Sequence, residues 1–165
     1  MHKDEARIKR LFPSYFELFK LPDGAGEEEI QVYRACKTCK CDKESFTPSY
    51  EEKEFKHNEG DDPDDPGQYS LSTYEKPKDC KRFVKLNSEF QKPYKIAFGI
   101  THPQYGLVQR TKERKIKYKS SHVDYWLYEE ATPYEKFEMI EDFDSYLEIY
   151  KKEREGGNWC ERQLV

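Results

Sequence analysis

Apolar and polar residues alternate along the middle of the chain. In residues 94–100, Tyr94, Ile96 and Phe98 take alternate positions, which is the period of a β-strand with one buried face. Similar short runs predict further strands at residues 30–35, 69–74, 82–86, 107–111, 115–119 and 122–128. Short strands separated by brief turns are typical of an antiparallel meander or a small barrel.

The two ends of the chain show the helical period instead. In residues 3–20, apolar side chains recur three or four positions apart, and Pro13 interrupts the stripe. A second stripe follows Thr132-Pro133, a helix-start signal, and ends at Gly156-Gly157. We therefore expect an α+β fold, in which a small, mostly antiparallel β-sheet or partly open barrel is flanked by N-terminal and C-terminal helices.

The composition indicates a single globular domain over residues 1–165. Apolar residues make up only 35% of the chain, but 13 Tyr, 10 Phe and 2 Trp can build a core from large rings. Acidic residues gather with Pro and Gly at about residues 48–68, where we expect a mobile acidic loop because such a segment repels itself and buries little. No run is long and apolar enough to span a bilayer, so we expect no membrane partner.

Three cysteines form a C-x2-C-x-C cluster directly after the first predicted strand. Cys36, Cys39 and Cys41 have a spacing that can present thiolates to zinc, but a tetrahedral site needs four ligands. No second C-x2-C follows, so the missing ligands must come from scattered residues, Cys80 first among them. We predict a structural zinc held by Cys36, Cys39 and Cys80, with either Cys41 or a histidine, which would staple the fold.

Other interpretations of the cysteines stay open. In a secreted protein they would form disulfides, and in a reducing compartment they could be free thiols without a special role. A redox C-x2-C is a further alternative, because Lys37 and Lys40 could lower the thiol pKa values. The cysteine count of five is odd, which favours a reducing, intracellular location in the cytoplasm or nucleus.

A basic segment follows the predicted strand at residues 107–111. On a strand, Lys115, Lys117 and Lys119 would share one face. That face could hold a phosphate backbone or an acidic protein partner, and the plain alternative is a solvated sheet edge protected by lysines. The candidate binding residues are Arg110, Lys112, Arg114, Lys115, Lys117 and Lys119.

Three large rings lie close together before the C-terminal helix. Tyr125, Trp126 and Tyr128 are candidates for a partner-binding surface, because Trp and Tyr are enriched at binding hot spots. The alternative is that these rings build the core.

No catalytic motif is present: the chain has no Gly-rich phosphate loop, no H-E-x-x-H and no G-x-S-x-G. We therefore expect no enzymatic activity. The leading hypothesis is a protein–protein interaction (adaptor) domain stabilised by structural zinc. The alternatives are a nucleic-acid-binding module that uses the basic hairpin of residues 107–119, and a secreted effector with disulfides.

Overall fold

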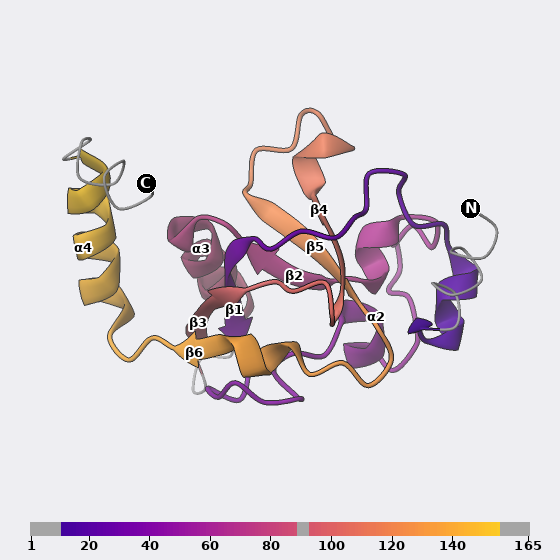
Figure 1. The fold of residues 1–165 in the computed structure, drawn as a ribbon, viewed down its shortest axis with the longest axis horizontal. Coiled ribbons are helices and arrows are strands. Elements are labelled where there is room, and N and C mark those ends of the chain that lie inside the picture. The colour runs from indigo at the N-terminus through magenta and orange to yellow at the C-terminus, as the bar shows by residue number, and fades with distance from the viewer. Residues whose placement is uncertain (1–10, 89–92, 156–165) are drawn as a thin grey trace.

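The computed structural model describes residues 11–88 and 93–155. Its centre is an open, antiparallel, six-stranded sheet in the order β4-β5-β2-β1-β3-β6 (Figure 1). The strands are β1 (Gln31–Cys36), β2 (Leu71–Tyr74), β3 (Lys95–Ile100), β4 (Gly106–Arg110), β5 (His122–Leu127) and β6 (Phe137–Met139). The predicted α+β class is confirmed.

The described helices are of two kinds. The α-helices are α2 (Ser49–Glu52), α3 (Pro77–Asn87) and α4 (Phe143–Glu155), and the 3-10 helices are η1 (Ser14–Leu18), η2 (Pro66–Tyr69), η3 (Thr111–Glu113) and η4 (Pro133–Lys136). The strand predicted at residues 82–86 is wrong, because this run lies inside α3. Pro77 starts that helix, and Cys80, Phe83 and Val84 then face the sheet at helical spacing.

Both ends of the chain differ in detail from the prediction. In the described part of the N-terminal stripe Leu11 is α-helical and η1 follows Pro13 as a 3-10 helix, and residues 3–10 of the prediction lie outside the described residues. The helical stripe expected after Thr132 is divided into η4, β6 and α4, and α4 begins near Ser145, where Asp142 and Asp144 allow a second helix to start. Phe137 pairs with Gly99 of β3. The Asp142 carboxylate then accepts a hydrogen bond from the Ser145 amide at 3.1 Å, and this cap starts α4.

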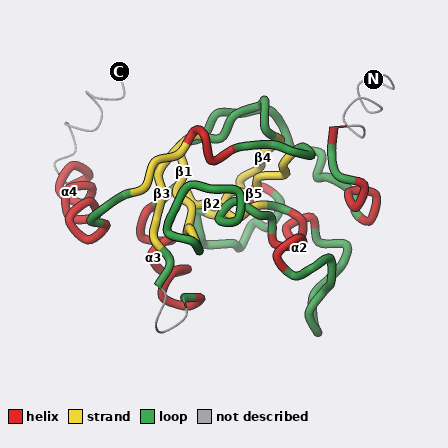
Figure 2. Tube along the Cα trace, turned by 90° about the horizontal axis from the view of Figure 1, so that it is seen from below, coloured by secondary structure: helices red, strands yellow, loops and turns green. Residues whose placement is uncertain are grey.

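Alternate residues of the strands enter two cores. Val32 and Cys36 of β1 belong to the cluster that also contains Tyr125, whereas Tyr33 and Ala35 pack on the opposite face against α3. Figure 2 shows α3 and the segment with η4 on opposite sides of the sheet. The sheet is therefore covered on both faces.

The acidic segment of residues 48–68 makes specific contacts. Lys53 Nζ lies 3.0 Å from an Asp61 carboxylate oxygen and 2.8 Å from Gln68 Oε1, and the Tyr69 hydroxyl donates to the Pro63 carbonyl at 2.6 Å. Its mobility stays a prediction, but these contacts join parts of the segment to one another and to Tyr69 of η2.

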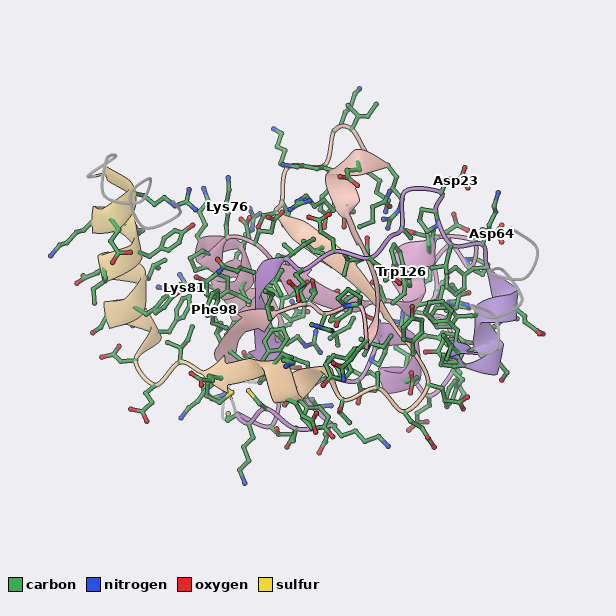
Figure 3. The ribbon with its side chains drawn as sticks, viewed as in Figure 1. Asp23, Asp64, Lys76, Lys81, Phe98 and Trp126 are labelled. Atoms are coloured by element: carbon green, nitrogen blue, oxygen red, sulfur yellow. The ribbon has the colours of Figure 1, made fainter. Side chains whose placement is uncertain are left out.

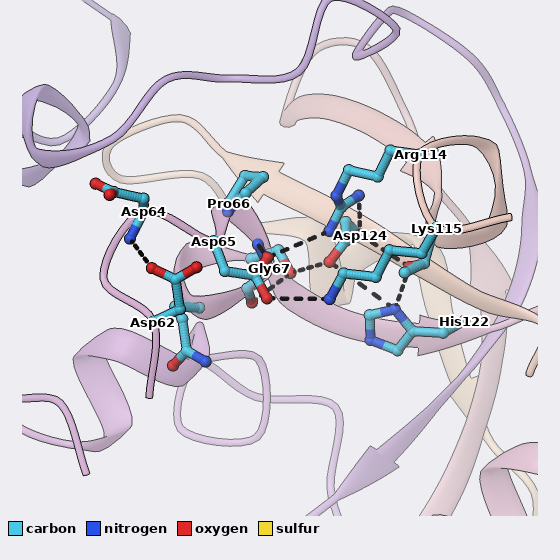
Figure 4. A network of polar contacts seen from close by, with 12 residues as sticks. Asp62, Asp64, Asp65, Pro66, Gly67, Arg114, Lys115, His122 and Asp124 are labelled. Carbon is cyan, nitrogen blue, oxygen red and sulfur yellow. Dashed lines mark hydrogen bonds and ion pairs between the residues drawn. The ribbon is translucent and has the colours of Figure 1, made fainter. Parts of the chain in front are cut away.

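A further attachment is built around Asp124, whose side chain is fully buried in β5 (Figure 4). Its carboxylate accepts hydrogen bonds from Ser70 Oγ at 2.6 Å and Thr111 Oγ1 at 2.8 Å. Arg114 Nη1 approaches it to 2.7 Å, and the same guanidinium lies 3.8 Å from Asp65. One buried charge therefore joins the acidic segment, β2, β5 and the β4–β5 connection.

His122 extends this network. The single hydroxyl proton of Thr111 goes to Asp124, so His122 Nδ1 must carry the proton in its 2.6 Å contact with Thr111 Oγ1. Burial lowers the pKa of His122 from its ordinary value, against the opposing pull of the Asp124 charge. The folded protein therefore holds this imidazole neutral.

This lowered pKa predicts a loss of stability in mild acid. Below about pH 6.5 the unfolded chain binds a proton at His122 that the folded chain resists, so the free energy of unfolding should fall by about 1 kcal/mol between pH 7.5 and 5.5. Urea denaturation of wild type and His122→Asn across this range measures the effect. The variant should show the smaller fall, and equal falls in both proteins would contradict the assignment.

Candidate functional site

The structure does not gather the four predicted zinc ligands. Cys36 lies beside Cys41 in one core, whereas Cys80 is buried in the core on the other face of the sheet. Cys39 contacts the Pro93 carbonyl at 3.4 Å instead. Among residues 11–88 and 93–155, no group of three or more His, Cys, Asp or Glu side chains is arranged to hold a metal. Zinc therefore stays a prediction without a formed site in this arrangement.

Two of the thiols have raised pKa values, whereas the thiol of an activated redox cysteine has a lowered pKa. Burial raises the pKa of Cys36 to about 12, and burial likewise raises the pKa of Cys80. Since the thiolate is the reactive form, both residues are suited to packing rather than to exchange.

The basic segment is not the predicted lysine-faced strand. Residues 115–119 belong to the connection between η3 and β5, so the expected shared face does not form. Arg110 Nε pairs with Glu75 at 2.7 Å and Arg110 Nη1 pairs with Glu28 at 3.0 Å.

The remaining basic candidates fall into two groups. Arg114 is held by Asp124, and Lys115 Nζ lies 3.0 Å from Asp65. Lys112, Lys117 and Lys119 are exposed and make no ion pair within the described part of the chain. These three lysines are free to meet an external anion.

Two of the three aromatic candidates cannot contact a partner. Tyr125 and Trp126 are both 0% exposed, so the prediction that they form a binding surface is wrong. Trp126 Nε1 donates to the Pro66 carbonyl at 2.9 Å, and the Arg114 guanidinium lies 5.6 Å from the centre of its ring. Tyr128 is half-buried against Phe12, and its role in binding stays a prediction.

A groove that the sequence did not predict lies between α4 and the adjacent end of the sheet. It is a cavity of about 490 Å³, which we call the α4 groove. Figure 3 shows Lys76 and Phe98 on the part of the molecule that faces α4. Its lining includes the rings Tyr33, Phe98, Tyr146 and Tyr150 and the cations Lys76, Lys112 and Arg154.

Few contacts position α4 beside the sheet. The hydroxyl groups of Tyr33 and Tyr146 are hydrogen-bonded, and the two rings meet edge to face with centres 5.8 Å apart. Lys81 Nζ also reaches Asp144 at 3.0 Å. These contacts lie toward the beginning of α4, and Tyr150 and Arg154 of its later turns also line the groove.

The groove carries unneutralised positive charge. Lys76, Lys112 and Arg154 have no carboxylate partner among the described residues, and Arg154 lies over the Tyr150 ring at 5.0 Å. A second cavity of about 280 Å³ shares Lys76, Tyr150 and Arg154 and adds two further lysines, Lys78 and Lys151. Together they make an aromatic floor with a cationic rim, which suits an anionic ligand.

The search for related proteins found none: no family model, curated protein or solved structure matches this chain. Within the described residues, no helix has the length and apolar character needed to cross a membrane. The site must therefore be interpreted from its own chemistry.

The burial of the cysteines predicts an order of alkylation. In the folded protein, iodoacetamide should modify the half-buried Cys39 and Cys41 before the buried Cys36 and Cys80, which should react only after unfolding in urea. Peptide mass spectrometry at successive times measures this order. Reaction of Cys80 as fast as Cys39 in folded protein would contradict the arrangement. Joint protection of Cys36, Cys39 and Cys80 until a chelator is added would instead support the predicted zinc site.

Proposed function

We propose that the protein is a non-enzymatic interaction module (an adaptor) that binds an acidic segment of a partner protein in the α4 groove. The proposal rests on one observation: three cations without a carboxylate partner among the described residues line the same cavity as several tyrosine rings. The cations are Lys76, Lys112 and Arg154. Carboxylates of a partner segment would pair with the rim, and an aromatic or aliphatic side chain would pack on the floor.

The charge distribution favours a protein segment over a nucleic acid. Glu29 and Glu75 also line the groove, and the whole chain carries a net charge of −4. A phosphate backbone is usually met by a surface that is basic throughout. A short acidic peptide can place a few carboxylates on the cations and avoid the groove's own acids.

A nucleic-acid ligand is the second candidate, and the rings of the groove favour it. Phe98 and Tyr150 together with Lys76 and Arg154 offer the stacking surface and cations that single-stranded nucleic acid uses. The hairpin of residues 107–119 is less suited to this role than its sequence indicates, because the charges of Arg110 and Arg114 are taken up by carboxylates.

The state of the cysteines favours an intracellular location for the module. Cys36, Cys39, Cys41 and Cys80 are free thiols in the structure, and such thiols persist in a reducing compartment. The secreted alternative would require disulfide bonds, and none links the cysteines that the structure describes.

Selection from a random peptide library tests the proposal while the natural partner is still unidentified. We expect the selected peptides to be acidic and to carry an apolar residue. In fluorescence anisotropy, Lys76→Glu with Arg154→Glu should weaken the best peptide at least about tenfold, since two attractive contacts become repulsive.

The matched control is Lys43→Glu with Lys56→Glu, which makes the same change in charge at exposed residues that do not line the groove. It should retain the wild-type affinity. Selection of neutral or basic peptides, or equal weakening in both variants, would contradict the proposal. Tighter binding of a labelled oligothymidylate than of any selected peptide would favour the second candidate.

A further inference from the structure

Three apolar side chains are exposed on the end of α3 and on the β4–β5 connection. Ile116 is 91% exposed, Leu86 of α3 is 73% exposed and Tyr118 is 38% exposed. Leu86 and Tyr118 line the same shallow cavity of about 250 Å³, so the end of α3 and the connection adjoin. Single exposed apolar residues are ordinary, but a group with a polar border indicates an interaction surface.

Cations surround these apolar side chains. Arg82 and Lys119 line the cavity with Leu86 and Tyr118, and Lys117 lies between Ile116 and Tyr118 in the chain. None of the three cations has an ion-pair partner among the residues that the structure describes. We call the set Arg82, Leu86, Ile116, Lys117, Tyr118 and Lys119 the loop patch.

The neighbouring acids do not neutralise the loop patch. Asp79 lines the same cavity, and its carboxylate accepts a hydrogen bond from the Ser121 amide at 2.9 Å and keeps its charge. Glu113 is exposed in η3, before the tip of the connection. Three cations against these two acids leave the loop patch positive.

The base of the connection is fixed while its tip is free. Arg114 is anchored by Asp124 and Lys115 by Asp65, directly before Ile116. Figure 1 shows the connection between β4 and β5 rising above the ends of both strands. The fold therefore presents the apolar tip and its lysines away from the sheet.

We propose that the loop patch docks the protein on an anionic lipid membrane. Ile116 and Leu86 would enter the region between headgroups and acyl chains, while Lys117, Lys119 and Arg82 would contact anionic headgroups. This site differs from the α4 groove and does not depend on the proposed function. It also revises the expectation of no membrane partner, since attachment to a surface needs no spanning helix.

The side-chain chemistry distinguishes a membrane from other occupants. Ile116 and Leu86 are the most exposed apolar members of the loop patch, and being aliphatic they offer no plane on which a base can stack. Within the loop patch the stacking planes that a nucleic acid needs come from Tyr118 and Arg82 alone, and Tyr118 is the least exposed of its apolar members. Protein interfaces are depleted in lysine, and their hot spots are seldom leucine. Aliphatic residues bordered by lysines match the two signals, apolar insertion and charge attraction, that reversible membrane binding combines.

Co-sedimentation with vesicles tests the proposal. The protein should bind vesicles made of phosphatidylcholine and phosphatidylserine in equal amounts, should not bind pure phosphatidylcholine, and should be released by high salt. Lys117→Glu with Lys119→Glu should weaken binding about tenfold or more, since each lysine is attracted to the anionic surface. The Lys43→Glu and Lys56→Glu double variant, equal in charge, should bind better than the loop variant.

A second pair of variants tests the apolar contact. Ile116→Ser with Leu86→Ser should also weaken binding severalfold, and both positions are exposed enough to leave the fold intact. Leu18→Ser with Ile149→Ser changes two apolar residues that are 55% and 58% exposed elsewhere, and should bind as wild type. The proposal is overturned if the protein does not bind the anionic vesicles, or if both serine pairs weaken binding equally. It is also overturned if the protein binds an oligonucleotide but not vesicles, and the Ile116→Ser and Leu86→Ser pair abolishes that binding.

Discussion

The fully buried carboxylate of Asp124 is the constraint on which the arrangement of the loops depends. A buried charge is costly unless it is paired and hydrogen-bonded, and here Ser70, Thr111 and Arg114 together meet that requirement. These partners come from the residue that joins η2 to β2 and from the β4–β5 connection. Satisfying one carboxylate therefore fixes segments that are distant in sequence.

The same network decides which basic residues are free to act. Arg114 turns inward to Asp124, and Lys115 follows toward Asp65 at the end of the acidic segment. The acidic and basic blocks of the sequence thus neutralise each other at this point. What remains exposed is a smaller set of cations, divided between the α4 groove and the loop patch. Each of these two groups of exposed cations forms the positive part of one proposed binding surface.

The parts of the fold with strong local patterns could be predicted. The strand at residues 94–100 alternates clearly and agrees with β3. Residues 82–86 hold only three apolar side chains among two cations, and so short a run fits one turn of an amphipathic helix as well as a strand. The zinc prediction depended on Cys36 and Cys80 meeting, and the structure places them in separate cores on opposite faces of the sheet. The α4 groove could not be predicted, because its walls come from β1, β3, β4 and α4 and only the tertiary fold brings them together.

A double-mutant cycle between Asp124 and Arg114 tests the central claim most directly. Free energies of unfolding in urea would be measured for wild type, Asp124→Asn, Arg114→Gln and the double variant. Asp124→Asn should cost about 3 kcal/mol because it leaves the Arg114 charge poorly compensated, and the double variant should lose less than the sum of the singles by about 1 kcal/mol or more. Additive losses, or a negligible effect of Asp124→Asn, would contradict the claim that this buried pair holds the loops in place.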